Sequence, residues 1–327
     1  MSTGTDPLAP LAELPGVPEA VAEVRKAVDR LYGHRVMRRR AGEVTSESAL
    51  RGARASAALD GADWPLEEVR RRTDFGADPE ARAVGAALRI SAEAGQLLSV
   101  WRTSPLQVLA RLHLLAVGDA DPAAGRPRQG SEGAAELFPI ELKPVEGIDA
   151  DGHATDRHAT DRHATDGHAT DELGAGGGAR AGQSLAAGAV LSPAPSAAEA
   201  AARLDQLAGL LVARAERPTG GAPALVVAAV VHGELMALRP FGAHNGLVAR
   251  AAQRIVLIAE GLDPKAICPA EVGLAELGTA AYQEALNGYL SGTPEGMARW
   301  ITHCGAALRL GVRESTAVCE AMQRGMA

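Results

Sequence analysis

The sequence predicts a mainly helical protein. Phe, Trp and Tyr make up 3% of the 327 residues, while 46% are hydrophobic. Ala, Leu and Val must therefore fill the core, and this composition favours closely packed helices over sheets. Apolar residues also recur at helical spacing along most of the chain. One segment, ELFPIELKPV, is instead compatible with a short β-hairpin flap.

The net charge of −7 argues against a nucleic-acid partner, because neutralising phosphates requires a basic surface. The short runs Arg38–Arg40 and Arg70–Arg72 lie near acidic residues, so we interpret them as solvated helix faces. No stretch reaches the roughly 18 apolar residues of a membrane span. The N-terminus lacks the basic start and apolar core of a signal peptide. The three cysteines have no paired spacing, which indicates free thiols. We expect a cytoplasmic protein with no membrane partner.

Four regions follow along the chain. Residues 1–17 are expected to be a flexible lead. Residues 18–102 form a predicted helical extension, with helices over about 18–33, 45–61 and 79–100, the first carrying apolar residues at helical spacing. Residues 103–312 form the predicted main domain, and 313–327 a C-terminal tail.

Six helices are predicted in the main domain, over about 105–117, 197–216, 222–238, 246–260, 279–290 and 294–312. Ser104 and Thr293 are the expected N-caps of the first and the last. The third is almost wholly apolar, so it should be buried. His113 lies inside the first helix, and we expect it to line the core or a groove rather than to act in catalysis.

Residues 147–196 change character and are predicted to be a disordered insertion. A five-residue HATD unit repeats four times and places four histidines in register: His153, His158, His163 and His168. Five residues is neither a helical nor a strand period, so these side chains would not share a face. A metal-binding tract is the alternative. The Gly, Ala, Pro and Ser-rich sequence that follows favours disorder.

The segment LRPFGAHNGLVAR joins two of the predicted helices. Asn245 and Gly246 stand where the second helix begins. Free backbone N–H groups and the helix dipole favour an anion there, Asn is a good cap, and Gly lets an anion approach the backbone. Arg250, one turn later, can point toward the same anion. An ordinary corner between two helices with an Asn cap is the other interpretation.

This segment resembles the signature of the Fic family, H-P-F-x-D/E-G-N-G-R-x-x-R. The matching positions are Pro240, Phe241, Asn245, Gly246 and Arg250. The resemblance extends over roughly 20–312 and implies a Fic-type helical bundle. The resemblance is strengthened by the segment before Arg239, which contains His232 and resembles the helix that precedes the family's loop.

A second resemblance lies far upstream, in ASAALDGADW. Ser56, Asp60 and Gly61 match the family's inhibitory motif, S/T-x-x-x-E-G/N, with Asp in place of Glu. In the family this acid pairs with the second arginine of the signature and blocks the γ-phosphate site. The resemblance therefore implies that Asp60 faces Arg250 across the helical extension and the main domain.

Four positions depart from the family signature: Arg239 replaces the catalytic histidine, Ala243 the acid, His244 a glycine and Leu247 the first arginine. An arginine stays protonated and accepts no hydrogen bond, so Arg239 cannot be a general base, and losing a base costs about 10²–10⁴ in rate. Ala243 cannot hold magnesium. The family's ATP and Mg are thus implied by resemblance only, and no metal site is predicted.

The sequence thus predicts a catalytically degenerate Fic-like protein. Its expected role is a binding or regulatory module with a protein partner and weak nucleotide or anion binding at Asn245, Gly246 and Arg250. One alternative is an active transferase that attaches AMP or another nucleotidyl group to protein hydroxyls with non-standard residues. Another is a decaying gene product without selected activity. His232 and Glu234 are expected to be structural, and His244 is disfavoured as a displaced base. No sequence feature indicates an oligomeric state.

Overall fold

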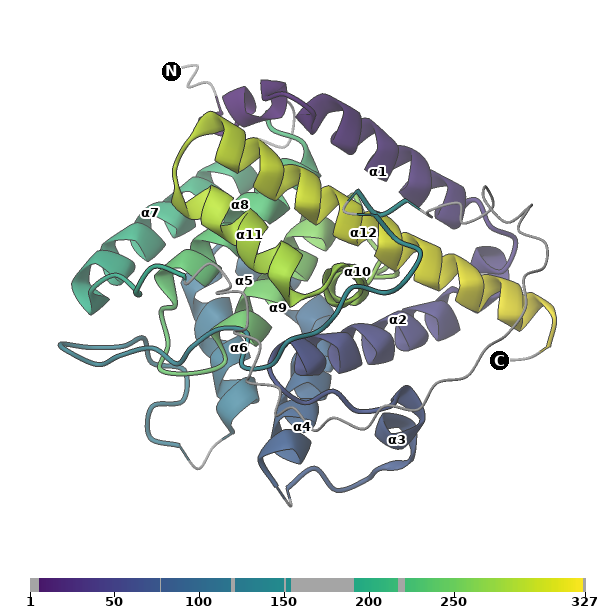
Figure 1. Cartoon of the computed structure of the whole chain (residues 1–327), viewed down its shortest axis with the longest axis horizontal. Helices are drawn as coiled ribbons and strands as arrows, with labels where there is room; N and C mark the ends of the chain where they lie inside the picture. Colours follow the sequence, from purple (N-terminus) through teal and green to yellow (C-terminus); the bar gives the residue numbers. More distant parts are fainter. Residues whose placement is uncertain are drawn as a thin grey trace, which may run out of the picture.

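The computed structural model describes residues 6–76, 78–118, 121–149, 151–153, 191–216 and 221–325. These residues form helices joined by irregular segments, and none of them forms a strand (Figure 1). The predicted mainly helical class is therefore confirmed. The helices are α1 Val17–Tyr32, α2 Met37–Leu59, α3 Leu66–Arg71, α4 Pro79–Glu93, α5 Leu98–Trp101, α6 Pro105–Val117, α7 Ala197–Ala215, α8 Ala224–Leu238, α9 Asn245–Ala259, α10 Ala270–Leu277, α11 Thr279–Leu290 and α12 Pro294–Gln323, with short 3₁₀ turns η1 Ala9–Glu13 and η2 Ala94–Leu97.

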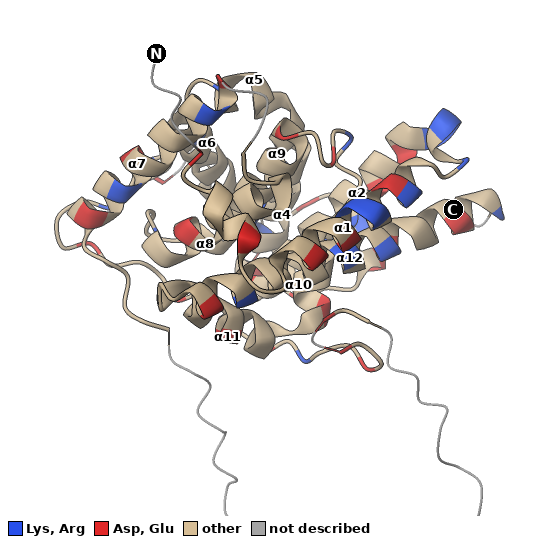
Figure 2. Ribbon diagram, turned by 90° about the horizontal axis from the view of Figure 1, so that it is seen from above, with Lys and Arg blue, Asp and Glu red and all other residues tan. Residues whose placement is uncertain are grey.

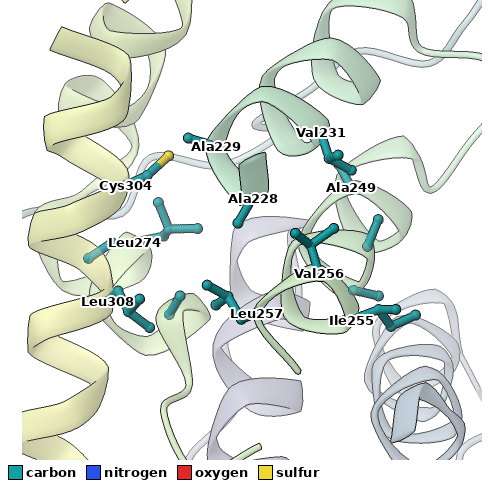
Figure 3. Close-up of a cluster of buried hydrophobic side chains, with 14 of the residues drawn as sticks. Ala228, Ala229, Val231, Ala249, Ile255, Val256, Leu257, Leu274, Cys304 and Leu308 are labelled. Carbon is teal, nitrogen blue, oxygen red and sulfur yellow. The ribbon is translucent and has the colours of Figure 1, made fainter. Parts of the chain in front are cut away.

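The centre of the fold is the pair of helices α8 and α9, which pack against each other. Helix α8 is apolar on all sides, as the sequence predicted, and nearly every side chain of both helices is buried. A helix of this kind is stable only when other elements surround it. Figure 3 shows small aliphatic side chains from α8, α9, α10 and α12 filling one cluster, among them Ala228, Val256, Leu274 and Leu308. Close helix packing therefore replaces the aromatic residues that the composition lacks.

The remaining helices cover this pair. The long helix α12 lies beside α1, α2, α10 and α11 (Figure 1). Helices α2 and α4 of the predicted extension pack directly on α9, so the extension and the main domain share one hydrophobic core. Acidic and basic residues are interspersed on outer helices such as α2 and α12 (Figure 2). Among the described helices, none combines the length and the apolar composition that crossing a bilayer requires.

A buried ion pair ties α9 to α10. The guanidinium of Arg254 donates to both carboxylate oxygens of Glu271, at 3.0 and 2.9 Å, and the two side chains are only 7% and 8% exposed. Burial by itself would lower the pKa of Arg254, but Glu271 raises it above its usual value. Arg254 is therefore charged, and it depends on Glu271 for compensation.

The prediction of a flexible lead is wrong for residues 6–17. Leu8 and Val17 are buried, and Asp6 forms an ion pair with Arg214 of α7 while accepting a hydrogen bond from the backbone of Ala222 at 2.8 Å. Asp6 and Leu8 therefore hold this segment against the rest of the fold. The segment has no helical periodicity, so its sequence pattern did not indicate that it is ordered.

The predicted C-terminal tail is also wrong in part, because α12 continues without a break to Gln323. Val318, Cys319 and Met322 are buried along this extra length. The N-cap at Thr293 is confirmed, since its hydroxyl accepts from the backbone of Gly296 at 3.1 Å. Ser104 precedes α6 as predicted, but its side chain makes no capping hydrogen bond. The short helices α3 and α10 were not predicted.

The predicted hairpin flap does not form. Residues 136–145 are irregular, because Pro139 and Pro144 lack the N–H groups that a strand pair requires. The segment instead binds the junction of α10 and α11: the Leu142 carbonyl accepts from the backbone of Thr279 at 3.0 Å, and the Thr279 hydroxyl accepts from the Leu142 N–H at 3.0 Å.

Most of the predicted insertion, with His158, His163 and His168, lies outside the described residues. Its first residues are ordered, which corrects the start predicted at 147. The Asp149 carboxylate accepts from the backbone of Asp151 and of His153, at 3.0 and 2.7 Å. At the far end, Ser196 caps α7 by accepting from the backbone of Glu199 at 3.2 Å.

Candidate anion site

The loop between α8 and α9 is closed by Asn245. Its amide accepts from the Phe241 N–H at 2.9 Å and donates to the Phe241 carbonyl at 2.8 Å. The predicted Asn cap is therefore wrong: Asn245 is the first residue of α9, and His244 precedes it in a left-handed conformation with φ 57°. No side chain caps α9, so its N-terminal N–H groups remain available to an anion.

Arg250 and the upstream motif meet over this helix terminus. The guanidinium of Arg250 is buried and donates from Nε to the Ser56 hydroxyl at 2.8 Å, and from Nη2 to the Ser56 carbonyl at 2.9 Å and to Asp60 Oδ1 at 2.5 Å. Burial would lower the pKa of Arg250, but Asp60 and then Tyr282 raise it above its usual value. Arg250 is therefore charged. Its carboxylate partner is Asp60, the residue directly after α2.

Gly246 explains how the acid reaches the helix. A Cβ atom at this position would lie 2.6 Å from Asp60 Oδ1 and 2.8 Å from Arg250 Nη1. Only glycine leaves room for the carboxylate above the first turn of α9, where the helix dipole favours negative charge. Asp60 can be delivered there because Gly61, with φ 103°, turns the chain immediately after it. The Asp60 carboxylate thus lies beside the first turn of α9.

The buried side chains of Tyr282 and His232 lie close to Arg250. Tyr282 is fully buried, and its hydroxyl lies 2.5 Å from Nε2 of His232. Burial, and then the charge of Arg250, lower the pKa of His232 well below its usual value, so this histidine is neutral. Glu234 is engaged elsewhere, accepting from Arg203 and from the Tyr289 hydroxyl. Both His232 and Glu234 therefore hold helices together.

Arg239, at the position of the family histidine, ends α8 with φ 42° and is 9% exposed. Its Nη2 donates to the Ser192 carbonyl at 2.5 Å, and its Nε has no acceptor among the described residues. Burial, and then neighbouring Arg128, lower its pKa. An arginine still keeps its proton at neutral pH, so this side chain donates hydrogen bonds and accepts none.

Sequence reasoning missed Arg128. Its guanidinium is buried and donates to four backbone carbonyls: those of Arg239 at 2.7 Å, Glu132 at 2.9 Å, and Pro195 and Leu238 at 3.1 Å. Two of these acceptors belong to the C-terminal end of α8, where a cation is favourable. Arg128 lies in an irregular segment with no periodic pattern, so no sequence signal distinguished it from a surface arginine.

The other departures from the signature also have structural consequences. Leu247 is 1% exposed and lies with Ala87 and Ile90 where α9 meets α4.

His113 of α6 packs on the same loop, because its ring stacks on Phe241 with the ring centroids 4.1 Å apart. Burial, and then the charge of His244, lower the pKa of His113 to about 4. The expected core or groove position of His113 is therefore what the structure shows.

The loop does not fit a magnesium ion, because Ala243 offers no ligand atom. Among the described residues, one group of three side chains could hold a metal ion, namely Asp149, Asp151 and His153, and all three are exposed. None of them belongs to the signature.

No model of a known protein family matches the sequence, and no curated protein matches it either. Solved structures do match. A Fic family protein from Desulfovibrio desulfuricans G20 is 18% identical with a TM-score of 0.57, over 91% of this chain and 74% of that one. Fic-1 from C. elegans is 12% identical (TM-score 0.54, 93% and 73%). A Fic domain containing signaling protein from Bacteroides thetaiotaomicron VPI-5482 is 11% identical (TM-score 0.55, 92% and 97%). The chain has the Fic fold.

Proposed function

We propose that this protein is a binding module built on the Fic fold, whose anion site at the N-terminus of α9 is held closed by Asp60. The observation that carries the proposal is the position of the Asp60 carboxylate, 2.5 Å from Arg250 and directly above Gly246. A phosphate that displaced Asp60 would gain the same guanidinium and the same helix N-terminus.

The ligand class is a nucleotide or a free phosphate, bound weakly. Asn245 shapes the loop, Gly246 admits the anion and Arg250 contacts it. The position of the family's first arginine carries Leu247, which is buried among apolar side chains, so a triphosphate would lack its second guanidinium. Displacing Asp60 also costs the pairing of a buried cation. Both effects lower the affinity.

The proposal excludes AMP transfer by the family's mechanism. That mechanism requires a base that accepts the proton of a target hydroxyl, and Arg239 cannot accept one. We expect the partner of the module to be another protein, which would sense whether the site is open or closed. The rival function, transfer of AMP to protein hydroxyls with non-standard residues, predicts measurable labelling.

The test is calorimetric titration of phosphate and of ATP, with and without magnesium, into the native protein and Asp60→Ala. We expect the variant to bind both ligands more tightly, without dependence on magnesium. Asp63→Ala is the matched control, because Asp63 is close in sequence but pairs with Arg54 on the surface. Equal affinities for all three proteins would refute the closed anion site. Labelling of any protein by radiolabelled ATP would favour the transferase instead.

A further inference from the structure

A separate pocket lies at the C-terminal end of α9, whereas the anion site lies at its N-terminus. The pocket has a volume of about 370 Å³, and its walls come from α1, the end of α5, the end of α7, the start of α8 and the end of α9. Helix α9 has 15 residues, so about 20 Å of helix separates the two sites. Neither Asp60 nor Arg250 borders this pocket, so it is distinct from the site of the proposed function.

The acidic groups beside this pocket are already paired. Arg214 donates from Nε and Nη2 to the two carboxylate oxygens of Glu260, at 2.9 and 2.8 Å, and from Nη1 to Asp6. Among the described residues, Glu260 is the one acidic side chain that borders the pocket. Both of its oxygens accept from Arg214, so they are not available to the other cations of the pocket.

Two further arginines border the pocket without a partner. Arg25 on α1 and Arg102, directly after α5, are both exposed. Within the described part of the chain, neither guanidinium takes part in a hydrogen bond or an ion pair. Their two positive charges exceed the single excess negative charge of the group that Arg214 forms with Glu260 and Asp6. The pocket is therefore electropositive, and its unpaired guanidiniums are open to a ligand.

Trp101 adds a neutral donor to these two cations. Its side chain is 4% exposed and borders the pocket, and a buried indole N–H usually has a hydrogen-bond partner. No described residue accepts from this N–H. The nitrogen is also not among the described polar atoms that are both unpaired and closed to solvent. An acceptor on a ligand can therefore reach it.

We propose that this pocket binds a dianionic phosphate group, which accepts hydrogen bonds from Arg25, Arg102 and the indole N–H of Trp101. All three unpaired groups are donors, so the ligand has to supply acceptors. A phosphate concentrates nearly two negative charges and several acceptor oxygens on one compact group, which suits two guanidiniums. Small-molecule sites have volumes of roughly 300–1,000 Å³, so this pocket has room for more than the phosphate. The group belongs either to inorganic phosphate or to a small phosphate ester.

The test is calorimetric titration of the native protein with inorganic phosphate, glycerol 3-phosphate and succinate, which spreads a similar charge over two carboxylates. We expect at least one phosphate probe to bind more tightly than succinate, and the tighter of the two identifies the source of the phosphate. Arg25→Gln and Arg102→Gln should each weaken this binding about 10-fold, as expected for the loss of a charged hydrogen-bond donor. Arg111→Gln is the matched control, because Arg111 is also on the surface but pairs with Glu93.

Indole fluorescence locates the bound phosphate independently. We expect phosphate to change the fluorescence of the native protein, and Trp101→Phe should remove most of this change, because the variant retains an aromatic ring but lacks the N–H. Three results would overturn the proposal: no binding of either phosphate probe, binding of succinate as tight as that of phosphate, or equal binding by the native protein and a folded variant with both Arg25→Gln and Arg102→Gln. A fluorescence change that persists in Trp101→Phe would place the phosphate elsewhere and would also overturn it.

Discussion

The carboxylate of Asp60 lies 2.5 Å from Nη2 of Arg250, although 190 residues separate the two in the chain. The contact joins the C-terminal end of α2 to the first turns of α9, and so links the predicted extension to the centre of the fold. Because the guanidinium is buried and the acid is 16% exposed, water screens their attraction less than it would on the surface. The expectation that these side chains face each other is confirmed.

Replacing Gly246 by alanine should disturb this pair. The new Cβ would lie 2.6 Å from the Asp60 carboxylate, and we expect the free energy of unfolding to fall by about 1–3 kcal/mol, as for other overpacked sites. The loss should be smaller when Asp60→Ala is already present. Gly209→Ala is the control: this helical glycine has nothing within 4 Å of a Cβ, so alanine should stabilise by about 0.5–1 kcal/mol. Denaturant unfolding of the four variants measures the coupling, and additive losses would contradict the contact.

Glu271→Ala should destabilise the protein by about 3–5 kcal/mol, because it leaves the buried Arg254 without its partner. Replacing both residues, as Arg254→Met with Glu271→Leu, should cost less than the single change, since no buried charge then remains. On the surface, Glu284 lies 3.8 Å from Arg299, and both are well exposed, so Glu284→Ala should cost about 0–1 kcal/mol. The free energy of unfolding of each variant, measured in urea, shows whether the three losses of stability follow this order. A double variant less stable than Glu271→Ala would be evidence against the argument.

His303 should make the protein sensitive to acid. Burial lowers its pKa from 6.5 to about 4, so between these pH values the unfolded chain binds a proton that the folded chain does not. Stability therefore falls as the pH drops from about 6.5 to 4, and below that range the loss is complete. The shift corresponds to roughly 3 kcal/mol.

His303→Phe should remove this contribution while retaining the ring that stacks on Tyr282 and Trp300. We expect the variant to lose less stability than the native protein between pH 6.5 and 4, measured by urea unfolding at several pH values. His34→Phe is the control, because this histidine lies near the surface end of α1. An unchanged pH slope in His303→Phe would show that His303 is not the group responsible.

The sequence was informative where a residue type had one physical role. Helix α8 could be predicted as buried because it is apolar on all sides, and Asp60, Gly246 and Arg250 could be placed together because the motifs that contain them are specific. The hydrogen bonds of the Asn245 side chain could not be predicted from the sequence. An asparagine at a helix start most often caps the helix, and only the local turn shows that it pairs with the backbone of Phe241.

Other features depended on contacts between distant segments. Asp6 is ordered by Arg214, and Arg128 by carbonyls at the end of α8, and neither partner can be recognised from local sequence. The C-terminal part of α12 is different. Val318, Cys319 and Met322 stand at helical spacing, so that extension was visible in the pattern and was missed.

The last prediction tests whether the altered signature abolishes transfer. Self-labelling by radiolabelled ATP should be absent from the native protein and from each single reversion, because Arg239→His supplies a base without a metal ligand or a phosphate clamp, and Ala243→Asp supplies a ligand without a base. Together with His244→Gly and Leu247→Arg, these changes rebuild groups that act as a unit, so the fourfold variant should gain far more labelling than the sum of the single changes.

The fourfold variant should also be less stable than the native protein. Leu247 is 1% exposed, so the new guanidinium enters an apolar space, and the fourfold variant should unfold at a lower temperature. Adding Asp60→Gly should raise labelling again by freeing the anion site. Labelling by the native protein at the rate of the fourfold variant would mean that Arg239 does not prevent transfer.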